Sequence, residues 1–194
     1  MGDGSSSRPY TLRRRAESQD ATRGRIVEAT VSLHQSEGPA RTTISAIAKL
    51  AGVQRHTVYR HFPDESALLK ACSGHFLAGH PPPDVRGWAR VEDPIERLRA
   101  GLEQLYSYYD ANEQMIANVL RDSAVVPVGA GFRALHTAAT AALTAGSRPR
   151  GEGPVFATAV RLATDFRTWQ VLSSGSDLSP GEGAELMCRM LGCL

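Results

Sequence analysis

Apolar residues recur along this chain at helical spacing, in segments separated by short polar breaks. The first clear segment begins at Ala21, where apolar positions three to four residues apart predict an α-helix. The pattern ends at SEGPAR, because Gly38 and Pro39 are residues that commonly end helices. Residues 1–20 are rich in Ser, Gly and Arg and show no pattern, which favours a flexible arm.

A second apolar stripe follows Thr42 and Thr43, which are both good helix N-cap residues. Gly52 then permits a tight turn, and a short helix is expected at residues 54–62. Asp64 predicts the N-cap of a fourth helix directly afterwards. Two helices joined by a turn with glycine form the helix-turn-helix arrangement.

The rest of the chain continues as helix after helix, with no alternating apolar and polar pattern typical of strands. HPPPD at 80–84 ends the fourth helix and separates a small head from a larger body. The segment from Pro154 to Gly175 has the longest apolar pattern. We therefore predict an all-α protein of about nine helices. The predicted domains are an arm at 1–20, a head at 21–66 and a body at 67–194.

Charge and cysteine content narrow the class of protein. The net charge is +2, but residues 1–70 hold 11 Lys or Arg against 7 Asp or Glu, whereas the remainder holds 11 against 13. This asymmetry directs any polyanion-binding role to the N-terminal third. The three cysteines are odd in number and lack metal-ligand spacing, which fits a reduced cytoplasmic protein. Neither a secretory signal nor an apolar run of about 18 residues is present.

Residues 42–62 contain Arg, Lys and His but no Asp or Glu. Arg55 and Tyr59 are four positions apart, as are His56 and Arg60, so these four side chains face one way on a helix. Arg and Gln can bind base edges in the major groove, whereas Thr, Tyr and His suit phosphates. We interpret the absence of carboxylates as evidence that this surface binds DNA, because carboxylates would repel the phosphates. The alternative is an exposed helix that is basic without a partner.

The segment IAKLAGVQRHTVYRHFPDESALL closely resembles the DNA-binding head of the tetracycline-repressor (TetR) family. The resemblance covers residues 22–72. It implies two sets of contacts to DNA. The candidates for phosphate contacts are Thr43, Ser45, Thr57, Tyr59 and His61. The candidates for reading bases are Gln54, Arg55, His56 and Arg60.

One position departs from the family pattern. The family usually has a Lys at the start of the fourth helix, where it meets a phosphate, and this chain has Glu65. That contact is therefore expected to be lost or replaced by backbone amides at the helix N-terminus. The arginines of residues 12–15 offer a second way to reach DNA, although they equally fit an arm that only aids solubility.

The same resemblance implies that the body forms a homodimer through its last helices. The residues themselves show two apolar ridges near the C-terminus, and two adjacent ridges favour half of a four-helix bundle. A monomer could instead bury one ridge in its own core. The candidate interface residues are Leu162, Phe166, Leu186 and Met190.

A pocket in the body for a small effector is also implied by the family. Aromatic and apolar residues with a few polar groups suit such a pocket, but the same residues at helical spacing also suit a plain core. His136 is the polar candidate, with an exposed helix face as its alternative. The candidates are Tyr109, Met115, Ile116, Val119, Leu120, Phe132, His136 and Trp169.

Cys72, His75, His80 and Asp84 lie close together in sequence, which raises the hypothesis of an enzyme. The histidine spacing fits no zinc signature, and neither a phosphate-binding loop nor a nucleophile elbow is present. We therefore predict no catalytic, metal or cofactor site. The expected function is a ligand-responsive regulator, by family expectation a repressor, bound to a palindromic operator as a homodimer. A DNA-binding architectural protein without a ligand is the alternative.

Overall fold

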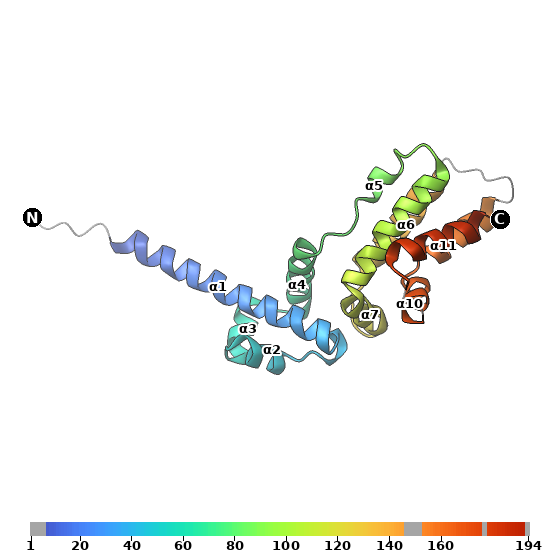
Figure 1. The fold of residues 1–194 in the computed structure, drawn as a ribbon. Coiled ribbons are helices and arrows are strands. Elements are labelled where there is room, and N and C mark those ends of the chain that lie inside the picture. Colours follow the sequence, from blue (N-terminus) through green and yellow to red (C-terminus); the bar gives the residue numbers. More distant parts are fainter. Residues whose placement is uncertain (1–6, 146–152, 176–177, 193–194) are drawn as a thin grey trace, which may run out of the picture. The chain divides into compact units, whose positions relative to one another are not determined.

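The computed structural model describes residues 7–145, 153–175 and 178–192, and every regular element in these ranges is a helix (Figure 1). The all-α class is thus confirmed, with eleven α-helices and one 3-10 helix in the described ranges, against about nine helices predicted. The chain forms two compact units. The head comprises residues up to His80 together with Asn118–Val128, and the body comprises Pro81–Ala117 and the residues from Gly129 onward.

The head is built around its first helix. α1 packs on α2 and α4, and α2 packs on α3. Ile26 and Val58 are fully buried in its core, with Ile47 and Phe62 nearly so. The elements are α1 (Ser7–Ser36), η1 (Pro39–Arg41), α2 (Ile44–Ala51), α3 (Arg55–His61), α4 (Glu65–Gly79) and the end of α7.

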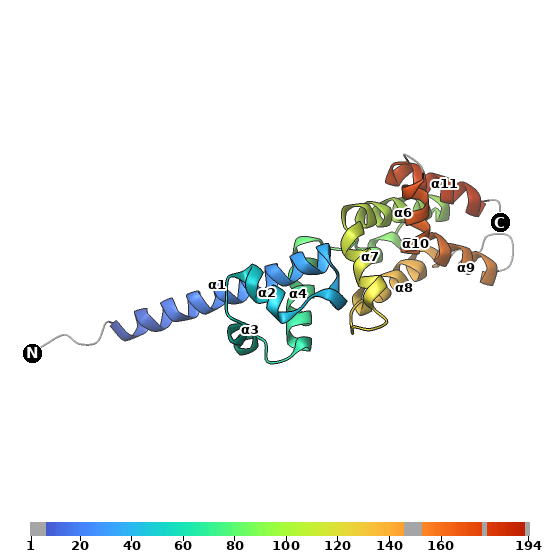
Figure 2. The ribbon, with the colours of Figure 1, turned by 90° about the horizontal axis from the view of Figure 1, so that it is seen from below.

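The interpretation of residues 1–20 as a flexible arm is wrong from Ser7 onward, because α1 begins there; residues 1–6 lie outside the described residues. Figures 1 and 2 show the first turns of α1 extending beyond the other helices of the head. Residues 10–23 contain neither Gly nor Pro, and Arg13 Nε lies 3.0 Å from Glu17 Oε1 one turn later. A helix can therefore form here without an apolar stripe.

The body packs around α6, which lies beside α11 (Figure 2). Leu102, Leu105, Tyr106 and Tyr109 of α6 are fully buried. The elements are α5 (Val85–Trp88), α6 (Pro94–Ala111), the start of α7 (Glu113–Asp122), α8 (Ala130–Thr144), α9 (Gly153–Ala163), α10 (Phe166–Ser174) and α11 (Pro180–Gly192).

The long apolar segment from Pro154 to Gly175 forms two helices rather than one, because it breaks between α9 and α10. Asp165 caps α10, since its side chain accepts from the Arg167 N–H at 2.7 Å. The hydroxyls of Tyr106 and Tyr109 donate to the carbonyls of Ala163 and Thr164, each at 2.8 Å, which satisfies groups at the end of α9.

The two units do not follow the predicted domain limits of 66 and 67. α4 belongs to the head, and so does the segment Asn118–Val128. α7 is consequently a continuous helix that begins in the body and ends in the head. Side chains of this segment bind backbone groups about 80 residues earlier in the chain. Local apolar patterns do not reveal such long-range contacts.

Candidate nucleic-acid interface

The helix-turn-helix forms where the sequence predicted it. Thr43 caps α2 by accepting a hydrogen bond from the Ala46 N–H at 3.1 Å. Gly52 ends α2 in the left-handed region with φ 66°, a conformation that costs glycine little. The Val53 N–H then donates to the Ala48 carbonyl at 2.9 Å. These contacts fix the turn that sets the direction of α3.

α3 is held to the head by one apolar side. Val58 is fully buried, and Phe62, which directly follows α3, is 2 % exposed. Ile47 and Ala51 of α2 are buried in the same core. Burying a Val or Phe side chain contributes about 1.5–3 kcal/mol. These residues hold α3 and determine which of its side chains face solvent.

The opposite side of α3 carries the predicted DNA-contacting residues. Gln54, Arg55, His56, Tyr59 and Arg60 are exposed, whereas the flanking Thr57 and His61 are half-buried. Tyr59 is 49 % exposed, which is unusual for a large aromatic side chain. The structure therefore places all seven residues on one helix with its cap, and neither α2 nor α3 contains a carboxylate.

The end of α3 gains a cation that the sequence analysis missed. Arg23 of α1 lies over the Phe62 ring, with its guanidinium carbon 4.3 Å from the ring centroid. Burial, Arg60 and Arg23 together lower the pKa of His61. His61 is thus mainly neutral at pH 7, so a phosphate contact from it relies on hydrogen bonding rather than on charge. Only the position of Arg23, just before the buried stripe of α1, could have indicated its role.

The start of α2 provides the other predicted phosphate contacts. Thr43 and Ser45 are both exposed, although the Thr43 Oγ1 already accepts the capping hydrogen bond. The hydroxyl group of Thr43 can still donate to a phosphate. Glu65 is exposed at the first position of α4, next to the capping Asp64. The roles of Thr43 and Ser45 in DNA binding remain predictions.

The candidate effector residues do not all come together. Tyr109, Phe132 and Trp169 belong to one aromatic cluster in the body, whereas Val119 and Leu120 belong to the head. Met115 and Ile116 are buried. His136 is half-buried, with its Nε2 3.1 Å from the Arg161 carbonyl.

Phe166 completes the aromatic cluster, and its assignment to a dimer interface is wrong. Its ring centroid lies 5.4 Å from those of Tyr109 and Trp169, and its side chain is 1 % exposed. Phe166 is the first residue of α10, and its side chain lies in the body core. The other three candidates remain at the surface: Leu162 is 62 %, Leu186 39 % and Met190 57 % exposed.

Three of the four residues behind the enzyme hypothesis, Cys72, His80 and Asp84, make contacts within the fold. Burial raises the pKa of the Cys72 thiol to about 11, so it stays protonated at neutral pH. Asp84 caps α5 and pairs with Arg86 at 3.1 Å. The His80 ring stacks on Phe76, while His75 is exposed. Among the described residues, no group of His, Cys, Asp and Glu side chains is suited to hold a metal ion. Cys193 lies outside them.

Comparison with known proteins agrees with this geometry. Residues 26–72 match the family model described as "Bacterial regulatory proteins, tetR family". The chain is 42 % identical over 112 residues to the HTH-type transcriptional regulator TtgR of Pseudomonas putida. The aligned region covers 56 % of this chain and 53 % of TtgR. The chain therefore spans about half the length of the curated relatives that it matches first.

Solved structures share the fold at low sequence identity. NalD, the secondary repressor of the MexAB-OprM multidrug efflux pump in Pseudomonas aeruginosa, superposes with a TM-score of 0.58 at 20 % identity, over 90 % of this chain and 95 % of that one. A TetR transcription regulator from Haloarcula marismortui gives a TM-score of 0.56 at 18 % identity, over 88 % and 94 %.

The head of this chain is thus similar to the DNA-binding head of the tetR family of bacterial regulatory proteins. The residues matched by the family model include all of α2 and α3, and so include the exposed, carboxylate-free face of α3. Among the described helices, none is both long and apolar enough to cross a membrane.

Proposed function

We propose that this protein is a DNA-binding transcriptional regulator that binds a palindromic operator as a homodimer. The observation that carries the proposal is the exposed, carboxylate-free side of α3, which lies within the residues matched by the family model. Arg55 and Arg60 have the planar guanidinium groups that bind guanine edges or phosphates. A helix held by Val58 on one side presents these groups together.

Dimerisation is supported by the surface of the last helices. Leu162 of α9, Val171 of α10 and Met190 of α11 are each more than half exposed. α11 contacts both α9 and α10. Exposed apolar side chains on helices that pack together favour an association surface. A second copy of the chain would cover them and supply the second α3 that a palindrome requires.

Release by a small effector and repression are the finer parts of the proposal. The proposed effector site is at the aromatic cluster of Tyr109, Phe132, Phe166 and Trp169 in the body, because packed aromatic rings suit an apolar effector. NalD is named as a repressor, which supports the same sign of regulation here. A regulator of this kind acts in the cytoplasm, where the chromosome lies, and needs neither a cofactor nor catalysis.

Selection of bound fragments from sheared genomic DNA by the purified protein tests this function. We expect enrichment of a few fragments that share an inverted repeat, and candidate apolar ligands can then be tested for release. Enrichment without a shared sequence would instead favour the architectural DNA binder. Fragments no different from the input would contradict DNA recognition altogether.

A further inference from the structure

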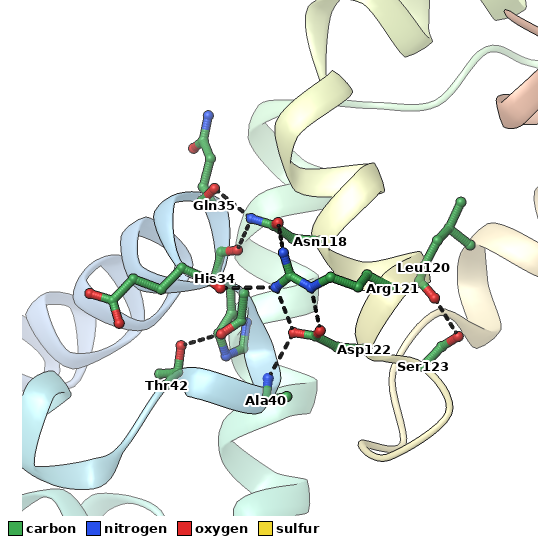
Figure 3. A network of polar contacts seen from close by, with 11 residues as sticks. His34, Gln35, Ala40, Thr42, Asn118, Leu120, Arg121, Asp122 and Ser123 are labelled. Atoms are coloured by element: carbon green, nitrogen blue, oxygen red, sulfur yellow. Dashed lines mark hydrogen bonds and ion pairs between the residues drawn. The ribbon is translucent and has the colours of Figure 1, made fainter. Parts of the chain in front are cut away.

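The last turn of α7 makes a polar cluster with the end of α1, and we call Asn118, Arg121 and Asp122 the α7 clamp (Figure 3). The Asn118 side-chain amide donates to the carbonyls of His34 and Gln35, at 3.1 Å and 2.8 Å. These carbonyls belong to the last turn of α1, where no backbone amide is placed to pair with them. Asn118 is 2 % exposed, so its two hydrogen bonds form away from water.

Arg121 and Asp122 extend the clamp to the segment between α1 and α2. Arg121 Nη2 donates to the Glu37 carbonyl at 2.9 Å, and Nη1 donates to Asn118 Oδ1 at 2.8 Å. The Asp122 carboxylate pairs with Arg121 at 2.7 Å and accepts from the Ala40 N–H at 2.9 Å. The hydrogen bonds from Arg121 lower the pKa of Asp122, which therefore remains charged at neutral pH. The charges of Arg121 and Asp122 thus neutralise each other, while each side chain also binds a backbone group of the α1–α2 segment.

Gly38 permits this close approach. Its φ is +98°, a conformation that other residues rarely adopt. A Cβ atom built on Gly38 would also lie 2.0 Å from Arg121 Nη2 and 2.5 Å from Asp122 Oδ2. The clamp and the turn after α1 are therefore fitted to each other.

The clamp lies only a few residues from the start of α2. Asp122 binds Ala40, and Thr42 Oγ1 donates to the Gly38 carbonyl at 2.9 Å. Thr43, the cap of α2, follows directly, and Ser45 lies in the first turn of α2. A displacement of the α1–α2 segment would consequently move both predicted phosphate contacts.

We propose that the α7 clamp positions the α1–α2 segment for DNA binding, so that breaking the clamp lowers the affinity of the head for its operator. The inference rests on the proposed function. The clamp residues belong to the same compact unit as α1 and α2. Asn118, Arg121 and Asp122 are positioning residues and touch no DNA themselves.

Asn118→Asp tests the clamp with an isosteric change. A carboxylate cannot donate to the carbonyls of His34 and Gln35, and its charge opposes the negative end of the α1 dipole. We expect affinity for the selected operator duplex to fall about 5- to 150-fold, the usual range of coupling between two sites. Asp122→Asn keeps an oxygen that can accept a hydrogen bond from the Ala40 N–H, so its operator affinity should fall less than that of Asn118→Asp. The matched control is Ser123→Ala, which removes only a hydroxyl that donates a hydrogen bond to the Leu120 carbonyl.

Affinity is measured by fluorescence anisotropy well below the unfolding temperature, with helicity checked by circular dichroism. A clamp that contributes only to stability would leave the affinity of the folded variant unchanged. Equal affinity of Asn118→Asp and wild type would therefore overturn the proposal, while leaving the proposed function intact. A wild-type protein that binds no specific duplex would overturn both.

Hydrogen exchange of the wild-type protein provides a second test that needs no variant. Coupling is reciprocal, so operator DNA must stabilise the clamp as much as the clamp favours operator binding. We expect the duplex to slow amide exchange in residues 118–122 as well as in α2 and α3. Protection confined to residues 22–72 would contradict the proposal.

Discussion

Arg55 and Thr57 lie two positions apart on α3 but differ in exposure, because Arg55 is exposed and Thr57 is half-buried beside the head core. A guanidinium on an exposed helix can reach base edges, whereas a short hydroxyl close to the core suits the nearby phosphate backbone. Base contacts carry sequence information and phosphate contacts do not. The two residues should therefore affect DNA binding in different ways.

Arg55→Ala should relax base discrimination by about 1–3 kcal/mol at one operator position. Thr57→Ala should instead weaken binding to operator and scrambled duplexes alike. Competition titrations with both duplexes measure the affinity ratio. An unchanged ratio in Arg55→Ala would show that Arg55 does not read a base.

His34 should make the stability of the head depend on pH. Burial lowers its pKa below the ordinary value of 6.5, with Asp122 opposing the shift, and its Nδ1 lies 3.8 Å from Cys72 Sγ. Below pH 6.5 the unfolded chain binds a proton that the folded head does not, so the free energy of unfolding falls as pH falls through this window. Above pH 6.5 His34 is mainly neutral in both states, so it no longer makes the free energy of unfolding depend on pH.

Urea denaturation at about pH 5.5 and about pH 7.5 measures this dependence, and His34→Gln is the comparison because it removes the titrating ring. We expect a smaller difference between the two pH values in the variant than in the wild type. An equal difference in both proteins would assign the dependence to other groups.

Among the elements, local signals predicted the helix-turn-helix well. Thr43, Gly52 and Asp64 each act through neighbours in sequence, so their roles as caps and turn residue could be recognised. The exposed face of α3 followed from helical spacing alone. These features depend on contacts within a few residues, which is the range over which a sequence pattern is informative.

Features that depend on distant contacts were missed or wrong. The break between α9 and α10 relies on tyrosine hydroxyls from α6, and the α7 clamp joins segments about 80 residues apart. Phe166 belongs to an apolar stripe in the sequence, but it follows the break between α9 and α10 and its side chain is buried in the core of the body. A stripe identifies apolar residues without stating which part of it packs inside the subunit.

Phe166→Ala should consequently destabilise the body by about 3–5 kcal/mol, the usual cost of removing a buried phenyl ring. Chemical denaturation followed by tryptophan fluorescence measures the change, since Trp169 packs on Phe166. Arg167→Ala, at an exposed position of the same helix, should change stability by no more than about 0.5 kcal/mol. A similarly small effect of Phe166→Ala would contradict its place in the core.

At the scale of the whole molecule, the exposed residues of α9 and α11 should control assembly. Leu162→Glu combined with Met190→Glu places charges where a second copy would bury them without a partner. We expect a folded monomer by light scattering, with operator affinity reduced because two half-sites are no longer linked. Val125→Glu, at a 77 % exposed apolar residue of the head, is the control and should remain dimeric. A double variant that stays dimeric would exclude this surface.

The most direct test of DNA binding by paired α3 helices is a hydroxyl-radical footprint of the wild-type protein on its selected fragment. A two-fold dimer that reads successive major grooves has recognition helices about 34–36 Å apart, or one helical turn of DNA. We therefore predict two symmetric sets of protected sugars, centred about one turn or a whole number of turns apart on one face of the duplex. A single protected set, or uniform protection along the fragment, would contradict recognition of an operator by two copies of α3.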